Sequence, residues 1–228
     1  MKTRRQSGFT MLELMLTLTI LSIVLAVVID GISMMQKRNA VEVSKVDLTQ
    51  SAREFMDQIV NDIHQAGYPS FIMFDTASFT APQSSTDCTV DSNVACGLVS
   101  LTSSDLQFEG DVDGTGVSEV FIELRPIGGP CPCTIRRGTE AKSAYMLGNL
   151  PAFYTQVDNV MNTTVFTASL TDGTPVTLPA NHGLGNLGNI TAIGITLYVK
   201  SADPDLQTGL YPMVTMVASA KISNVQKY

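Results

Sequence analysis

The sequence lacks the motifs on which most enzymes depend. It contains neither a G-x-S-x-G nucleophile segment nor a phosphate-binding P-loop. It has only two histidines, His64 and His182, and they stand far apart in the chain, without the cysteines or paired acids that a metal or nucleophile site needs. We therefore expect a protein that is not an enzyme and that needs no cofactor.

Charged residues are also scarce, at 15% of the chain, and acids outnumber bases to give a formal net charge of −7. An acidic surface repels a phosphate backbone, and Arg136-Arg137 is too small a basic patch to bind one, so nucleic acid is not an expected partner. Serine, threonine, glycine and asparagine are abundant, which suits a β-rich domain outside the cytoplasm.

One long apolar run is present near the N-terminus, from Phe9 to Ile29, and it is long enough to cross a bilayer as a helix. Lys2, Arg4 and Arg5 precede it, which predicts that the leader is cytoplasmic and that the rest of the chain lies outside. The run contains one carboxylate, Glu13. A charge inside hydrocarbon costs roughly 2.5–3.5 kcal/mol, so such a residue is expected to have a function and a partner.

An ordinary secretory signal explains this segment less well. Its apolar core is shorter, and a small-residue cleavage site such as Ala-x-Ala follows it, whereas none follows here. No cysteine lies near the run, which excludes a lipoprotein anchor. An uncleaved signal anchor, with Glu13 merely tolerated by tilt or snorkelling, remains an alternative.

The segment Gly8-Phe9-Thr10-Met11-Leu12-Glu13-Leu14 resembles the type III signal of type IV prepilins and type II secretion pseudopilins. The resemblance implies that a prepilin peptidase removes residues 1–8 by cutting between Gly8 and Phe9, and methylates the new N-terminus at Phe9. It also implies that Glu13 pairs with the N-terminal amine of a neighbouring subunit. Glu13 lies about one helical turn from Phe9, on nearly the same face, which suits that contact.

Apolar residues continue at three- and four-residue steps after the run, up to Ala66. Residues 9–66 are therefore expected to form one helix about 87 Å long. Residues 9–30 would be its membrane or filament-core part and residues 31–66 an amphipathic continuation. Gly31-Ile32-Ser33 marks an expected bend or soft spot, and Gly67-Tyr68-Pro69 an expected end.

Residues 67–228 are expected to form an extracytoplasmic, β-rich globular domain. Strand-like segments with turn residues between them follow a loop over residues 78–96, and the stretch from Gly183 to Gly188 is one of the turns. The expected strands are Leu98–Thr102, Asp105–Glu109, Val117–Arg125, Thr134–Arg137, Tyr145–Leu147, Phe153–Val157, Thr164–Leu170, Ile190–Lys200 and Tyr211–Ser223. The fold class is then α+β and pilin-like, with a long N-terminal helix packed on a mainly antiparallel sheet.

The four cysteines are Cys88, Cys96, Cys131 and Cys133, and in an exported domain they indicate disulfides. Pairing of Cys88 with Cys96 is favoured because it closes a short polar loop. Cys131 and Cys133 would then bridge to each other only under strain, so cross-pairing between the two loops is a serious alternative. The spacing does not suit zinc.

Asp111-Val112-Asp113-Gly114-Thr115-Gly116 resembles the start of a calcium loop, but it supplies too few oxygen ligands, and Glu119 stands at position 9 instead of 12. Asp-Gly between two strand-like runs is also typical of a hairpin turn, which is the favoured interpretation. Asp111 and Asp113 therefore remain weak calcium candidates.

Two later regions resemble PilW-like minor pilins and J-type minor pseudopilins: Gln65-Ala66-Gly67-Tyr68 with the helix before it, and the end of the chain from Val199-Lys200-Ser201 onward. The resemblance implies a minor subunit that is held in the inner membrane by one span and then incorporated into a type IV pilus, at its tip or at initiation of assembly. Its partners would be other pilins, the prepilin peptidase and the inner-membrane assembly platform. Alternatives are a minor pseudopilin of a type II secretion system and a pilus-tip adhesin that binds through residues 70–190.

Overall fold

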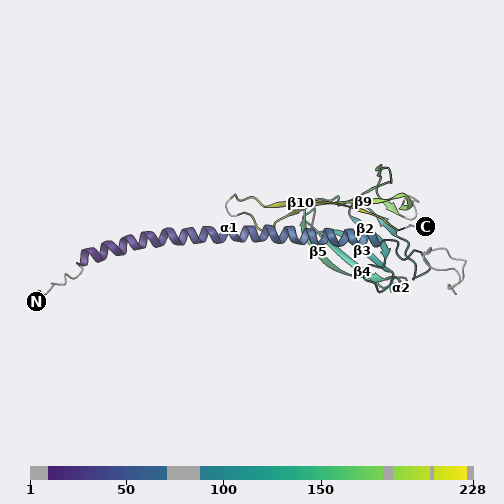
Figure 1. Ribbon diagram of the computed structural model, residues 1–228, viewed down its shortest axis with the longest axis horizontal. Helices are drawn as coiled ribbons and strands as arrows, with labels where there is room; N and C mark the ends of the chain where they lie inside the picture. The colour runs from purple at the N-terminus through teal and green to yellow at the C-terminus, as the bar shows by residue number, and fades with distance from the viewer. Residues whose placement is uncertain (1–9, 71–87, 182–186, 206–207, 225–228) are drawn as a thin grey trace, which may run out of the picture.

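A computed structural model describes residues 10–70, 88–181, 187–205 and 208–224 of the chain. One long helix, α1 (Met11–Gln65), extends well beyond a β-rich domain that packs against only its C-terminal half (Figure 1). The remaining elements are β1 (Leu98–Leu101), β2 (Asp105–Gly110), β3 (Ser118–Pro126), β4 (Cys133–Ala141), α2 (Lys142–Tyr145), β5 (Ala152–Val160), β6 (Phe166–Ser169), β7 (Pro175–Val176), β8 (Ala180–Asn181), η3 (Leu187–Asn189), β9 (Ala192–Lys200) and β10 (Met213–Lys221). The α+β, pilin-like fold expected from the sequence is confirmed.

The helix α1 has clear start and stop signals. The side chain of Thr10 accepts a hydrogen bond from the backbone N–H of Glu13 at 3.3 Å, which caps the N-terminus. At the other end Gly67 has a positive φ of 80°, a conformation that glycine adopts without strain. Between these ends the helix is continuous through Gly31, so the bend expected there is not found; α1 only curves gently (Figure 1).

The end of α1 is joined closely to β2. The N–H of Gly67 donates to the carbonyl of Glu109 at 2.8 Å, and the N–H of Asp111 donates to the carbonyl of Tyr68 at 2.9 Å. A side chain at Gly110 would place its Cβ 2.6 Å from the backbone oxygen of Gln65, so only glycine allows this approach. The helix C-terminus and β2 therefore hold each other in register.

The described strands form one ten-stranded sheet in the order β7-β6-β9-β5-β4-β3-β2-β1-β8, with β10 paired to β9. Every strand pair in it is antiparallel. Eight of the strands overlap the predicted segments, whereas β7 and β8, at two residues each, were not predicted. The prediction of a strand at Tyr145–Leu147 is wrong, because the chain turns there through α2 (Lys142–Tyr145).

The core lies between the second half of α1 and the sheet. One stripe of the helix is buried against strand residues that include Phe108, Ile122 and Leu197. An ion pair also joins the two layers, since Arg137 Nε on β4 donates to Asp62 Oδ2 on α1 at 2.9 Å. The buried apolar stripe consists of Ala52, Phe55, Met56, Ile59 and Ile63.

The structure contains two disulfides, each closing a short loop. Cys88 pairs with Cys96, which is the pairing favoured from the sequence. Cys131 pairs with Cys133 across a single proline, so the cross-paired alternative is not found. The first bridge lies beside β1 and β2, whereas the second lies in the connection between β3 and β4.

Candidate functional site

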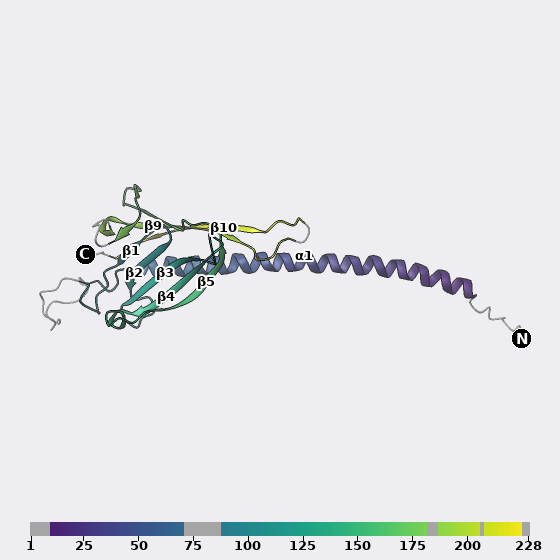
Figure 2. The same cartoon turned by 180° about the vertical axis from the view of Figure 1, so that it is seen from behind.

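The N-terminal half of α1 is the first candidate site. It is the one helix in the described ranges that is long and apolar enough to cross a membrane, with an 18-residue window of mean hydropathy 2.6. None of that window is buried against the rest of the chain. Figure 2 shows from the other side that this part of α1 projects away from the domain without contacting it. Apolar surface of this extent requires lipid or other helices around it.

Glu13 lies in the first turn of this exposed helix. A carboxylate there is stabilised by the partial positive charge of the helix N-terminus, and Thr10 and Glu13 have the spacing of a capping box. The recorded ion pairs of the described residues all lie beyond this segment, so none of them compensates Glu13. Gly8 and Phe9, the predicted cleavage and methylation site, lie outside the described residues. Glu13 therefore fits the start of a helix, and its carboxylate has no ion-pair partner among the described residues.

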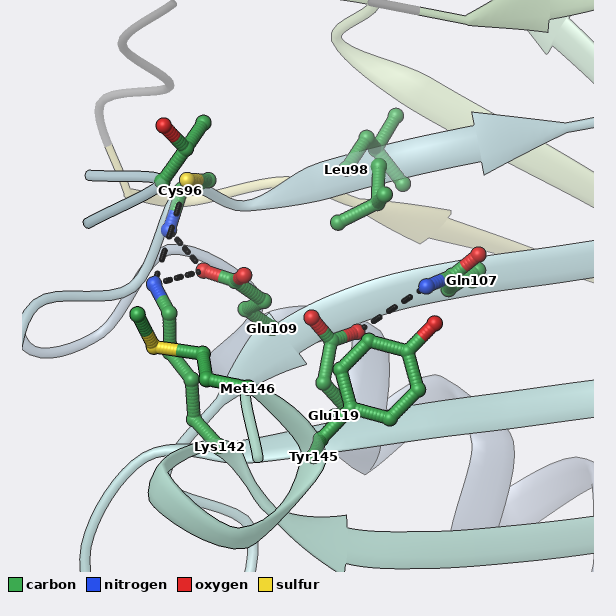
Figure 3. Close-up of a pocket in the computed structure, with 10 residues that line it drawn as sticks. Cys96, Leu98, Gln107, Glu109, Glu119, Lys142, Tyr145 and Met146 are labelled. Carbon is green, nitrogen blue, oxygen red and sulfur yellow. Dashed lines mark hydrogen bonds and ion pairs between the residues drawn. The ribbon is translucent and has the colours of Figure 1, made fainter. Parts of the chain in front are cut away.

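A second candidate is a pocket at the opposite end of the domain, beside α2, with a volume of 390 Å³ (Figure 3). Lys142 reaches into its wall and is only 1% exposed. Its Nζ donates to Glu109 Oε2 at 2.7 Å, to the carbonyl of Val94 at 2.7 Å and to the carbonyl of Cys88. Glu109 Oε2 also accepts the N–H of Cys96 at 2.6 Å.

These contacts concentrate on the loop that the first disulfide closes. The ammonium of Lys142 donates to two backbone carbonyls of the loop and to Glu109, so each of its three donors has an oxygen partner. Glu109 in turn accepts a backbone N–H of the loop, that of Cys96. The mutual attraction and the satisfied hydrogen bonds offset the cost of burying the two charges, whereas either member left alone would be costly. We interpret the pair as the structural clamp of the Cys88–Cys96 loop.

Glu119 lies next to this clamp, directly opposite Glu109 in the pairing of β2 with β3. Burial, followed by the hydrogen bond to Glu109 and its charge, raises the pKa of Glu119 to about 8. Gln107 Nε2 donates to Glu119 Oε2 at 3.1 Å, which acts in the opposite direction. The raised pKa of Glu119 favours its protonated form at neutral pH, which reduces the repulsion between the two facing carboxyl groups.

The loop between β2 and β3 forms a turn, as favoured from the sequence. Asp113 Oδ1 accepts the N–H of Thr115 at 3.0 Å and its hydroxyl at 2.6 Å, and these bonds lower the pKa of Asp113. Asp111 Oδ1 accepts the N–H of Gly116 at 3.2 Å. Glu119, the third acid considered for calcium, points instead to Gln107 in the buried cluster. Among the described residues no group of three or more histidine, cysteine or acidic side chains is placed to hold a metal.

The glycine-rich stretch Gly183–Gly188, expected as a turn, also has the letters G-x-G-x-x-G. A dinucleotide site would need a strand before this motif and a helix opening from it. Here the flanking elements are the two-residue β8 and the three-residue η3. Most of this glycine-rich stretch lies outside the described residues. Of the two histidines, His182 also lies outside them, and His64 is exposed on α1.

Lys142 and Glu109 were not predicted as a pair, because no sequence signal marks them. Glu109 is the next-to-last residue of β2, and Lys142 follows β4 in a segment without a motif. The oxygen partners of Lys142 precede it by 33 to 54 residues, and Cys96 precedes Glu109 by 13. Only the fold brings them together.

Residues 3–29 match the family model for the prokaryotic N-terminal methylation motif. Comparison of the whole chain with curated proteins and with solved structures gave no significant match. The motif is characteristic of type IV pilins and pseudopilins, and this chain combines it with an exposed apolar helix and a pilin-like α+β domain. The resemblance to type IV pilins and pseudopilins seen in the sequence is thereby confirmed.

Proposed function

We propose that this chain is a minor pilin, a structural and not a catalytic subunit, which is incorporated into a type IV pilus at its tip or at initiation of assembly. In this proposal a prepilin peptidase cuts between Gly8 and Phe9 and methylates Phe9. Before incorporation, α1 holds the protein in the inner membrane, with residues 67–228 in the periplasm. The inner-membrane assembly platform then adds it to the filament.

The single observation that carries the proposal is the exposed first half of α1. Its apolar segment is part of the methylation motif, which spans residues 3–29, and its apolar window is not buried against the domain. In the membrane, lipid can cover this surface. In a filament, the corresponding helices of neighbouring subunits can cover it, so the same segment serves both locations.

Glu13 gives the proposed assembly its specificity. Cleavage before Phe9 would create an amine at the membrane end of the helix, and Glu13, in the first turn, has no ion-pair partner within the described part of the chain. A neighbouring subunit that places its amine against Glu13 would remove the cost of an isolated charge in apolar surroundings. The pair would also fix the axial offset between the two subunits.

Complementation of deletion strains tests the proposal. The deletion mutant should lose surface pili, the intact gene should restore them, and the protein should be found in purified pili at a lower abundance than the main subunit. A minor pseudopilin of a type II secretion system is the competing assignment, because the motif occurs in both systems. Normal piliation with loss of protein secretion would favour that alternative over a pilus role.

A tip adhesin is a further alternative, and it can be tested in the same strains. Removal of residues 70–190 would leave adherence unchanged if the subunit is purely structural. Normal piliation with lost adherence would show a binding function.

A further inference from the structure

The strand β10 has one edge that pairs with β9 and one that does not. The nine residues of β10 pair with β9 without a bulge. At the two ends of the ladder, the N–H of Ser201 donates to the carbonyl of Pro212 at 2.8 Å, and the N–H of Ile222 donates to the carbonyl of Thr191 at 2.9 Å. Antiparallel pairing alternates, so the even-numbered residues of β10 bond to β9. The backbone N–H and C=O groups of five residues point to the outer edge: Met213, Thr215, Val217, Ser219 and Lys221.

Nothing in the described ranges pairs with this outer edge. The hydrogen bonds recorded outside regular strands include none from these five residues to another element. Natural sheets usually protect such an edge with a short strand, a proline, a bulge or inward charges. Here the edge is nine residues long, contains no proline, and has Lys221 at its end as its one charge. Met213 and Val217 are 60% and 72% exposed, so their side chains add apolar surface.

The direction of β10 limits what can pair with it. Near its start, Ser201 Oγ lies 3.0 Å from Ser44 Oγ of α1. Just after its end, Asn224 Nδ2 donates to the carbonyls of His64 and Ala66, both at 3.1 Å. The strand therefore runs along α1 in the same direction as the helix, as Figures 1 and 2 also show.

A second copy of this chain does not fit the edge well. Antiparallel pairing of two β10 strands, the more stable arrangement, would point the two α1 helices in opposite directions. The membrane-length segments of the two helices would then extend from the dimer in opposite directions. One membrane or one filament cannot accommodate both. The strands at the far ends of the sheet, β7 and β8, have two residues each and are too short to pair with a nine-residue edge.

We propose that the outer edge of β10 binds an extended strand of a different subunit in the same assembly, by adding that strand to the sheet. The proposal rests on the proposed function, because the partner is a member of the filament. Backbone hydrogen bonds to the five outward residues would supply affinity. The middle of the edge is uncharged, so the partner segment should be neutral and rich in β-branched or apolar residues where it faces Val217.

Hydrogen exchange on the full chain tests the proposal. Exchange is measured by mass spectrometry with residue-level fragmentation, once for the protein in detergent micelles and once in purified filaments. The amides of Thr215, Val217 and Ser219 should exchange about tenfold or more slowly in the filament, while those of Val214 and Met216, already bonded to β9, change little. Unchanged exchange at the outward amides, in filaments that contain the chain, would overturn the proposal but not the proposed function. Absence of the chain from filaments would overturn both.

A photo-crosslinking residue at position 217 of the full chain, in its own host, identifies the partner. A crosslink to an extended segment of a different filament subunit supports the proposal, whereas a crosslink to a second copy refutes it. Val217→Pro removes one outward N–H at an edge position where proline is tolerated, and Val217→Thr keeps the N–H and the branched shape. Incorporation into filaments should fall severalfold for the proline variant only, with both variants equally folded by circular dichroism; equal incorporation would contradict the proposal.

Discussion

Replacement of Lys142 by methionine should destabilise the domain more than any other substitution of a lysine in the described chain. Methionine keeps most of the length of the side chain but removes the ammonium. Glu109 would then be a buried carboxylate without its 2.7 Å partner, and the carbonyls of Cys88 and Val94 would lose a donor. Breaking a buried pair by removing one member typically costs about 3–5 kcal/mol, a large part of the stability of a domain.

The free energy of unfolding should be measured by urea titration of the full chain in detergent micelles, followed by circular dichroism. Lys221→Met, at an exposed position, is the matched control and should change the stability by no more than about 0.5 kcal/mol. In the double variant Lys142→Met with Glu109→Gln, the unpaired charge is absent, so the loss should be smaller than the sum of the single losses by more than about 1 kcal/mol. A cost below about 1 kcal/mol for Lys142→Met, or strict additivity in the double variant, would refute the clamp.

Three further predictions follow from the geometry. The pKa of Glu119 is raised to about 8 in the folded state, so the folded protein keeps a proton that the unfolded chain loses above the ordinary glutamate pKa of 4.5. The free energy of unfolding should therefore fall by up to about 1.4 kcal/mol per pH unit between pH 5 and 8. Glu119→Gln should flatten this slope in urea titrations. Arg137→Ala leaves Asp62 buried without its partner, so the unfolding free energy should drop by about 2 kcal/mol at neutral pH; an unchanged value would show that the pair does not join α1 to β4. Glu13→Ala should reduce incorporation into filaments beside wild-type subunits without changing the urea midpoint of the domain, and wild-type incorporation would refute the pairing role.

The sequence predicts the large features of the fold because they depend on local patterns. The apolar stripe of α1 keeps its three- and four-residue period up to Ala66, and Gly67 supplies the conformation that ends a helix, so both limits were predicted within two residues. Turn residues separate most of the predicted strands, and the long strands β9 and β10 alternate in burial. The Cys88–Cys96 bridge followed from the short loop between the two residues.

The features that the sequence did not predict depend on contacts between distant segments. The chain turns through α2 where a strand was expected at Tyr145–Leu147, and Lys142, the first residue of α2, is held by partners that precede it by 33 to 54 residues. The raised pKa of Glu119 comes first from burial and then from a cross-strand neighbour, Glu109, and both depend on the packing and register of β2 and β3. The open edge of β10 could not be recognised before the sheet order was known.

Mass spectrometry of the N-terminus of the protein purified from its native membrane or filaments tests the central claim most directly. The account predicts a chain that begins at Phe9 and carries one methyl group on its α-amine. An intact Met1, or a chain cut at any other position, would contradict the assignment of α1 as a pilin-type assembly helix.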